Sequence, residues 1–371
     1  MVMRRLRIRP LIAVTIAVIA ALVYLNNSSF LIEPLGAAPI LVAHRGLSQD
    51  FDRQGLTNQT CTAARMLPTP HEYLENTLPS MEAAFAYGAD IVEFDVHPTV
   101  DDRFAVFHDW TVDCRTNGTG VTREHSLAGL QALDIGYGYT SDGGKTYPFR
   151  GRGEGMMPSL KAVLATFPNQ NFIINVKSQD PNEGVLLAHR LAALPPKRQA
   201  QMMVYGAPDP VSIIREQLPQ IRTLWPRRLK QCLIRYAALG WTGYVPSNCK
   251  RSMLMLPINY APWLWGWPNR FLQRMEQVGT SVFLIGHYRG EGFSQGINDP
   301  EQLKGLPSDY AGGIWTDRID LIGPALKDRK SLKATKKHST RLHNSVPPQK
   351  PGGKFHWTLP QRAKQPGEAQ A

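Results

Sequence analysis

The chain has 371 residues, 43% of them hydrophobic, and is long enough to bury one large core or two smaller ones. Its formal net charge of +12 would favour a nucleic-acid partner if it were spread along the chain. Four of these charges are arginines within residues 1–9 and another +9 lie in residues 327–371, which leaves −1 for residues 10–326. The body is therefore nearly neutral, and no nucleic-acid partner is expected.

The N-terminal segment, residues 1–29, combines four arginines with a run of fifteen uncharged, mostly apolar residues from 11 to 25. A membrane span usually needs about 20 apolar residues, and the run also fits the core of a signal peptide. We expect an uncleaved signal anchor, with a cleaved signal peptide or a buried helix as alternatives. An anchor would place one span in a bacterial inner membrane and the body in the periplasm, whereas cleavage would leave the body periplasmic or secreted.

Short apolar segments alternate with segments of helical periodicity, such as residues 76–90 and 158–168, over about 280 residues. This alternation predicts an α/β fold, a (β/α)₈ TIM-type barrel, over residues 30–326. A TVDD turn follows the second strand, so the third is expected to form an additional hairpin. The nine expected strands are 39–46, 90–96, 103–109, 171–178, 201–206, 221–225, 254–259, 281–286 and 312–317.

The four cysteines are even in number, and an exported protein can oxidise them. Cys232 and Cys249 bracket a short stretch, so we prefer Cys232–Cys249 with Cys61–Cys114 among the three possible pairings. Four buried thiols remain the alternative, because no CxxC spacing is present.

Two further segments have unusual compositions. The basic, proline-rich tail 327–371 is expected to be a disordered, solvated segment, with contact to an anionic surface as the alternative. Residues 257–271 carry three tryptophans at alternate positions. They would either pack a loop against the barrel, which we favour, or dock on lipid.

Polar side chains stand at the ends of the first four strands, which meet at one face of a parallel barrel. Two carboxylates on one strand face would repel unless a cation lies between them, as a divalent metal would. Arginine and lysine beside them would hold a phosphate, and two histidines could move protons at neutral pH. The set predicts metal-assisted phosphodiester cleavage. Its members are His44 and Arg45, then Glu93 and Asp95, then His108, and finally Lys177.

The ordered motifs AHRG (43–46), ENT (75–77), VEFDV (92–96), FAVFHD (104–109) and GGIWTDR (312–318) resemble the glycerophosphodiester phosphodiesterase family. The resemblance implies a TIM-type barrel that hydrolyses glycerophosphodiesters to glycerol 3-phosphate and an alcohol, with Ca²⁺ or Mg²⁺ as cofactor. It also implies roles for the matching residues: His44 and His108 as the acid/base pair, Arg45 and Lys177 as phosphate contacts, Glu93 and Asp95 as metal ligands, and Glu75 as a supporting residue that orients Arg45.

Asn175 departs from that family's pattern, in which a Glu-x-Lys sequence on the fourth strand supplies a third protein ligand to the metal. An amide oxygen can still coordinate Ca²⁺, but the site loses one negative charge. We expect a working site with weaker or altered metal preference. The alternative is a degenerate envelope protein that binds phosphodiesters without cleaving them.

Three points remain open from the sequence. The substrate could be a deacylated glycerophosphodiester or a lysophospholipid presented by the membrane. A phosphatidylinositol-type phospholipase C shares the barrel and paired-histidine logic, although the ENT and ExD motifs suit it less well. Asp317 could line the barrel mouth or cap a turn, whereas His71, His97 and His125 are expected to be structural.

Overall fold

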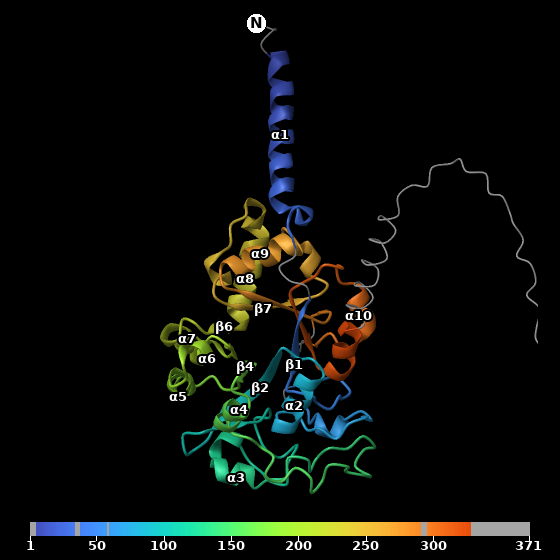
Figure 1. Ribbon diagram of the computed structural model, residues 1–371, viewed down its shortest axis with the longest axis vertical. Helices are drawn as coiled ribbons and strands as arrows, with labels where there is room; N and C mark the ends of the chain where they lie inside the picture. Colours follow the sequence, from blue (N-terminus) through green and yellow to red (C-terminus); the bar gives the residue numbers. More distant parts are fainter. Residues whose placement is uncertain (1–4, 34–37, 58, 291–294, 328–371) are drawn as a thin grey trace, which may run out of the picture. The chain divides into compact units, whose positions relative to one another are not determined.

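The computed structural model describes residues 5–33, 38–57, 59–290 and 295–327 (Figure 1). The predicted tail, apart from Lys327, lies outside the described residues. The helices are α1 (Arg5–Asn27), α2 (Leu78–Ala86), α3 (Leu127–Gln131), α4 (Leu160–Thr166), α5 (Pro181–Ala192), α6 (Pro196–Gln199), α7 (Pro208–Gln217), α8 (Pro226–Leu239), α9 (Asn269–Gln277) and α10 (Pro300–Lys304). The strands are β1 (Ile40–His44), β2 (Ile91–Pro98), β3 (Phe104–Val106), β4 (Asn171–Val176), β5 (Met202–Gly206), β6 (Arg222–Leu224), β7 (Met253–Pro257), β8 (Ser281–Ile285) and β9 (Gly313–Thr316).

Eight strands run parallel in the order β6-β5-β4-β2-β1-β9-β8-β7. The two ends of this path approach each other through one parallel bridge between Thr223 and Ser252, so the barrel is nearly closed. The predicted TIM-type barrel is therefore confirmed. β3 pairs antiparallel with β2, with Val96 opposite Val106, and it is the ninth strand outside the barrel path, as expected.

Side chains along each strand point alternately into the barrel and out toward the helices. The apolar side chains therefore form an inner cluster within the barrel and an outer layer between strands and helices. The inner cluster contains Val42 of β1, Ile91 of β2 and Ile173 of β4. The intervening strand residues pack outward in the largest apolar cluster. Because side chains alternate, His44, Glu93, Asp95 and Asn175 share the inward face with that inner cluster.

A separate apolar cluster forms beside the barrel from the two long loops, residues 47–74 and 110–157. Phe107, Val112, Leu130 and Tyr139 are buried in it. The loops thus have a core of their own, which gives them a defined position over the carboxyl ends of β1–β3.

Two disulfides are present, and they are the pairs favoured from the sequence. Cys61–Cys114 has a Cα–Cα distance of 5.4 Å and joins the two long loops. Cys232–Cys249 has a Cα–Cα distance of 4.9 Å and joins α8 to the segment before β7. Both distances lie in the usual range.

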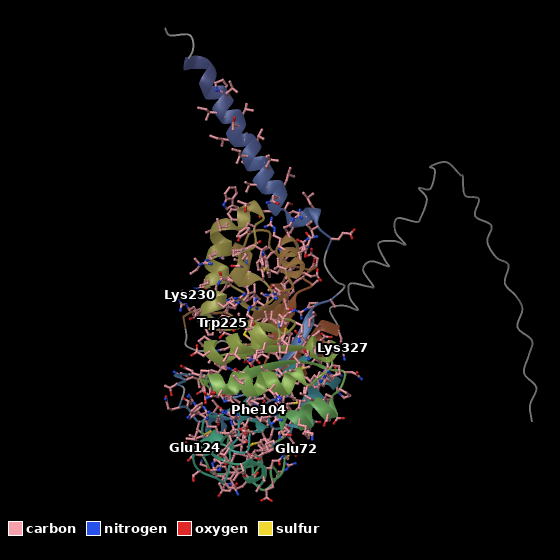
Figure 2. The ribbon with its side chains drawn as sticks, turned by 90° about the vertical axis from the view of Figure 1, so that its left-hand side faces the viewer. Glu72, Phe104, Glu124, Trp225, Lys230 and Lys327 are labelled. Atoms are coloured by element: carbon pink, nitrogen blue, oxygen red, sulfur yellow. A yellow bond between two sulfur atoms is a disulfide. The ribbon has the colours of Figure 1, made fainter. Side chains whose placement is uncertain are left out.

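Helix α1 includes an 18-residue window, Pro10–Asn27, with a mean hydropathy of 1.9 and no buried residues. Its side chains project on all sides of the helix (Figure 2). The helix is long and apolar enough to cross a membrane, a test that a signal sequence also passes.

The tryptophans of residues 257–271 differ in how far they are buried. Trp267 packs against Phe271 and Tyr310, with ring centroids 6.1 and 5.6 Å apart, as expected for a loop packed on the barrel. Trp263 is 83% exposed. The favoured packing role therefore holds for Trp267 and is wrong for Trp263.

Candidate active site

The turn after β1 places His44 and Arg45 at the mouth of the barrel. Arg45 has a positive φ of 61°, and Gly46 follows at 79°. A Cβ on Gly46 would lie 2.5 Å from the Ser80 hydroxyl, so only glycine fits here. The close approach lets the start of α2 pack directly against the turn, with Leu47 N donating to Ser80 O at 3.0 Å.

Three consecutive residues before α2 have three separate tasks. Glu75 accepts a hydrogen bond from Arg45 Nη1 at 3.0 Å. Asn76, with φ of 60°, donates from Nδ2 to Asp95 Oδ2 at 3.0 Å and accepts from the Asp95 backbone N–H at 3.1 Å. Thr77 is the N-cap of α2 and forms a capping box with Ser80. The motif therefore fixes the helix and orients two charged side chains.

Glu93 and Asp95 lie on the inward face of β2, and both are fully buried. Glu93 accepts hydrogen bonds from the Tyr205 hydroxyl at 2.7 Å and from the Arg45 backbone N–H at 3.2 Å. Burial, together with the neighbouring Asp95 charge, raises the pKa of Glu93 to about 7. Burial opposes the ionisation of Asp95. The charges of Lys177 and Arg45 nevertheless hold the pKa of Asp95 far below its usual range. Two adjacent carboxylates thus share too little positive charge for both to ionise fully.

Asn175 lies beside Asp95 in the β2–β4 ladder. Its Nδ2 donates to Asp95 Oδ1 at 2.8 Å, and Lys177 Nζ lies 3.6 Å from the same oxygen. Arg45 Nε approaches Asp95 Oδ2 to 3.3 Å without the geometry of a hydrogen bond, and so remains an unpaired buried donor. Arg45 and Lys177 therefore converge on one carboxylate from two strands.

Each candidate catalytic histidine has an aspartate on its Nδ1. His44 Nδ1 is 2.5 Å from Asp317 Oδ1, and His108 Nδ1 is 2.7 Å from Asp109 Oδ1. Burial and Arg45 lower the pKa of His44, but Glu93 and Asp317 outweigh them, and the pKa is raised overall. Such carboxylate contacts fix the tautomer of each ring and leave its Nε2 clear of the aspartate. The Nε2 of His44 lies 3.7 Å from Glu93 Oε2.

The pKa of His108 shifts in the opposite direction. Burial, and then the charges of Arg45 and Lys177, lower this pKa well below its ordinary value. The two rings consequently differ in charge preference although their aspartate contacts are alike.

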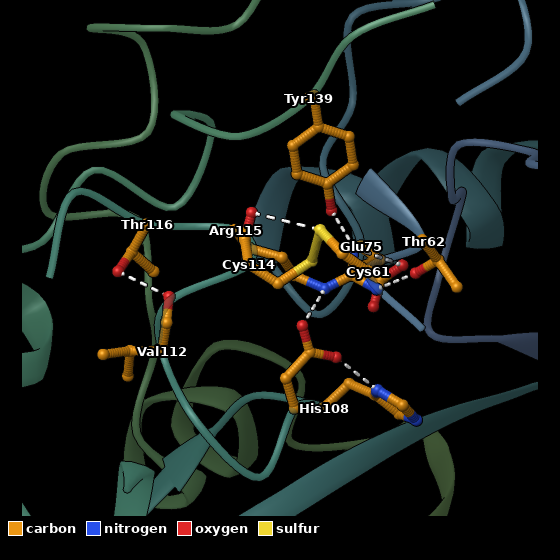
Figure 3. The surroundings of a disulfide bond; sticks show 10 residues. Cys61, Thr62, Glu75, His108, Val112, Cys114, Arg115, Thr116 and Tyr139 are labelled. Carbon is orange, nitrogen blue, oxygen red and sulfur yellow. Dashed lines mark hydrogen bonds and ion pairs between the residues drawn. A yellow bond between two sulfur atoms is a disulfide. The ribbon is translucent and has the colours of Figure 1, made fainter. Parts of the chain in front are cut away.

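Arg115 links the His108–Asp109 pair to Glu75, which accepts a hydrogen bond from Arg45. Figure 3 shows Arg115 with His108 and Glu75. Arg115 is 2% exposed and donates from Nε to Asp109 Oδ2 at 2.9 Å. Its Nη1 lies 3.3 Å from Glu75 Oε2 and 2.5 Å from the Tyr139 hydroxyl. Since Cys114 precedes it, the Cys61–Cys114 disulfide holds the backbone that carries this arginine.

A cavity of about 990 Å³ opens over these groups. Both histidines and both phosphate-contact candidates line it, together with Glu75 and Asp317. Glu93, Asp95 and Asn175 lie beneath, on the inward faces of β2 and β4. Cationic side chains and two histidines thus border the cavity, with buried carboxylates beneath them.

The strand that carries Lys177 ends in a buried acid–hydroxyl contact. Ser178 donates to Glu183, which is 2% exposed, and burial raises the pKa of Glu183 to about 7. The folded state favours the protonated form of Glu183. The stability that this group adds to the folded protein is therefore full below about pH 4.5, and it is lost as the pH rises through about 7.

We therefore expect Glu183→Gln to increase the free energy of unfolding by up to about 3 kcal/mol at pH 8 and by little at pH 4.5. Thermal unfolding at both pH values measures this. An equal stabilisation at the two pH values would contradict the assignment, because an uncharged glutamine has no pH-dependent advantage over a neutral glutamic acid.

The donor set fits a hard divalent cation. Among the described residues, no three histidine, cysteine or acidic side chains are close enough together to hold a metal, so Asn175 would have to complete the set. Its amide points nitrogen toward Asp95, and a half-turn of the amide would present its oxygen instead. The raised pKa of Glu93 marks a carboxylate pair that an added cation would relieve.

Residues 44–194 match the model of the glycerophosphoryl diester phosphodiesterase family. A glycerophosphodiester phosphodiesterase of Bacillus subtilis is 29% identical over 171 residues, which are 42% of this chain and 50% of the relative. The lysophospholipase D GDPD3 of Mus musculus is 26% identical over 264 residues, 66% of this chain and 76% of the relative.

Residues 44–194 are therefore similar in sequence to the glycerophosphoryl diester phosphodiesterase family.

This similarity agrees with the HRG, ENT, ExD and HD motifs, which all contribute to one site. The chain spans half or less of the length of the first curated relatives. Two solved structures share the fold: a glycerophosphoryl diester phosphodiesterase domain from Mycobacterium tuberculosis (TM-score 0.53, 15% identity, 78% of this chain and 98% of that chain) and a protein of the same type from Agrobacterium tumefaciens (0.50, 16%, 80% and 99%).

Every site residue expected from the sequence lies in or directly beneath the cavity. The sequence did not single out Arg115, Tyr205 or Asn76. Tyr205 is next to Asn175 in the β4–β5 ladder, a neighbour that only the strand register reveals. Of the histidines expected to be structural, His97 is buried with its Nε2 3.3 Å from the His108 carbonyl.

Proposed function

We propose that the chain is a phosphodiesterase that hydrolyses glycerophosphodiesters to glycerol 3-phosphate and an alcohol. The observation that carries this proposal is the cavity in which two His–Asp pairs face Arg45 and Lys177. A phosphodiester carries one negative charge, and two cations at its oxygens would offset the charge that grows as the phosphorus is attacked.

Proton transfer is assigned to the two histidines. One ring takes the proton of the attacking hydroxyl, and the other donates a proton to the leaving alcohol oxygen. Asp317 and Asp109 each contact Nδ1 of their ring, which would leave Nε2 to exchange the proton. The chain thus moves one proton at each end of the bond that is exchanged.

A divalent cation, Ca²⁺ or Mg²⁺, would be held by Glu93, Asp95 and the amide oxygen of Asn175. When bound, it would withdraw charge from a phosphoryl oxygen as a Lewis acid. Arg45 and Lys177, which contact Asp95 in the present structure, would then be released toward the substrate phosphate.

Asn175 supplies the test of that ligand set. We expect Asn175→Glu to lower the Ca²⁺ concentration for half-maximal activity by about tenfold, because a third carboxylate replaces a neutral ligand. Activity titrations with Ca²⁺ and Mg²⁺ measure it, with Asn171→Glu, at the half-buried start of β4, as the matched control. An unchanged titration midpoint would remove Asn175 from the ligand set.

We also infer that α1 anchors the barrel to a bacterial inner membrane with the site in the periplasm. The two disulfides support an oxidising compartment, and the exposed apolar helix supports a span. Cleavage after a signal peptide is the alternative, and the N-terminal sequence of the mature protein distinguishes the two.

A lysophospholipid is the second candidate substrate. It is favoured by the match to a lysophospholipase D over 66% of this chain and by the membrane helix. We would compare glycerophosphocholine with detergent-dispersed lysophosphatidylcholine on the full-length protein. Release of glycerol 3-phosphate from the former supports the proposal, turnover of the lysolipid alone moves the substrate into the membrane, and tight binding without turnover supports the degenerate binding protein.

A further inference from the structure

Six large apolar side chains are exposed in segments that surround the end of α1. We call them the collar: Phe30 (96% exposed), Leu31 (60%), Trp241 (42%), Tyr244 (53%), Trp263 (83%) and Trp265 (39%). A water-facing surface has no need for three tryptophans and a fully exposed phenylalanine in one neighbourhood, and such patches usually mark an interaction site.

Hydrogen bonds fix the end of α1 to the segments after α8. Asn26 Nδ2 donates to the Trp241 carbonyl at 3.1 Å, and Asn27 Nδ2 donates to it at 2.8 Å. Arg274 of α9, which is 6% exposed, donates to the Asn26 carbonyl at 2.9 Å and to Asn27 Oδ1 at 3.0 Å. The helix therefore joins the barrel through a hydrogen-bonded junction.

The remaining collar segments belong to the same junction. Ser29 Oγ, in the 3₁₀ turn Ser29–Leu31 that carries Phe30, donates to the Gly266 carbonyl at 2.7 Å. Trp265 Nε1 donates to the Ala237 carbonyl, near the end of α8, at 2.8 Å. The collar residues are thus brought together from three parts of the chain by contacts between their own segments.

The charge of the surrounding segment is strongly one-sided. Residues 217–275, the cationic flank, contain nine lysines and arginines and no acidic residue. Since residues 10–326 carry −1 in total, the rest of that body carries −10. None of the nine forms an ion pair with an acid among the residues described here. The pKa of Arg228 is lowered to about 10 by burial and by Arg215 and Arg251, as expected for cations without a counter-charge.

We propose that the collar and the exposed cations of the flank rest on the surface of an anionic phospholipid bilayer, which holds one side of the barrel against the membrane. These cations are Arg227, Lys230, Arg235, Lys250 and Arg251. Tryptophan and tyrosine prefer the bilayer interface, and arginine and lysine are attracted to anionic headgroups. The proposal rests on the inferred membrane span of α1. It adds that the barrel docks beside the span and is not merely tethered by it.

The test uses full-length protein reconstituted into vesicles of phosphatidylcholine with phosphatidylglycerol. All four native cysteines are paired, so a single added cysteine can be labelled with an environment-sensitive fluorophore. Trp263→Cys and Tyr244→Cys report on the collar. Val185→Cys on α5, 48% exposed, and Tyr87→Cys, 39% exposed, are the matched controls outside it. Quenching by nitroxide-labelled lipid and by aqueous iodide is compared at each position.

We expect lipid-borne nitroxide to quench both collar labels at least about twofold more than the controls, and iodide to quench them about twofold less. Omitting phosphatidylglycerol or raising the salt concentration should weaken this difference. Collar labels that iodide reaches as readily as the controls would overturn the proposal. Shielding from iodide without quenching by lipid would also overturn it, because a protein partner or second copy would then cover the collar. Release of the chain by alkaline carbonate would instead refute the span on which the proposal depends.

Discussion

His44→Ala and His108→Ala are each expected to lower kcat/KM for glycerophosphocholine by about 10³-fold, because each removes a proton carrier at one end of the cleaved bond. The double variant should fall little further, since both rings act in the same step. Steady-state kinetics at saturating divalent cation measure the loss. His125→Ala is the matched control, because half-buried His125 is not among the residues that line the cavity and its Nε2 lies 3.2 Å from the Thr119 carbonyl.

Both histidines must matter for the assignment to stand. If one alanine variant kept the wild-type rate, the corresponding His–Asp pair would be a structural contact, and the proton at that end would have to come from another group. Among the groups lining the cavity, Lys177 would then be the next candidate for variation.

Arg115→Met is expected to cause the largest loss of stability. Arg115 is 2% exposed and contacts Asp109 and Glu75, so its removal leaves two carboxylates facing each other without their shared cation. Breaking a buried ion pair in this way costs about 3–5 kcal/mol. Activity should fall as well, because Asp109 orients His108 and Glu75 orients Arg45.

Thermal unfolding of the purified full-length variants measures the stability change. Arg152→Met is the control, because Arg152 pairs with Glu72 at the exposed surface, where such pairs contribute little to stability. Arg115→Lys keeps the charge but cannot bridge both carboxylates, so it should lie between the wild type and the methionine variant. A melting temperature unchanged in Arg115→Met would show that the two carboxylates are held by other groups.

The parts of the site that lie on strands could be predicted, because strand periodicity fixes which residues share a face. Glu93 and Asp95 are two residues apart on β2, and Asn175 and Lys177 repeat that spacing on and just after β4, so a parallel barrel must bring them together. The short TVDD turn after β2 identified β3 as the additional hairpin strand.

The parts that lie on loops could not be predicted in the same way. Arg115 reaches Glu75 and Asp109 only because two long loops pack on their own apolar cluster and are joined by a disulfide. No periodicity links these loops in the sequence. Asp317 was ambiguous for a related reason: its contact with His44 depends on β1 and β9 being neighbours in a nearly closed barrel.

The features that we propose to face a membrane show the same division. The apolar run of α1 was evident in the sequence. The exposure of Trp263 and the partial burial of Trp267 were not evident, because both residues belong to the same alternating tryptophan motif. Which tryptophan faces water depends on the packing of the 3₁₀ turn Ala261–Trp263 and on the contacts of Trp267 with Tyr310.

The most direct measurement of the proposed activity is a ³¹P NMR time course of glycerophosphocholine with the full-length protein and Ca²⁺, Mg²⁺ or chelator. We predict that the phosphodiester signal is replaced by that of glycerol 3-phosphate, that chelator stops the conversion, and that His44→Ala abolishes it. A phosphodiester signal that persists with either metal, or conversion to choline phosphate in its place, would contradict the proposed reaction.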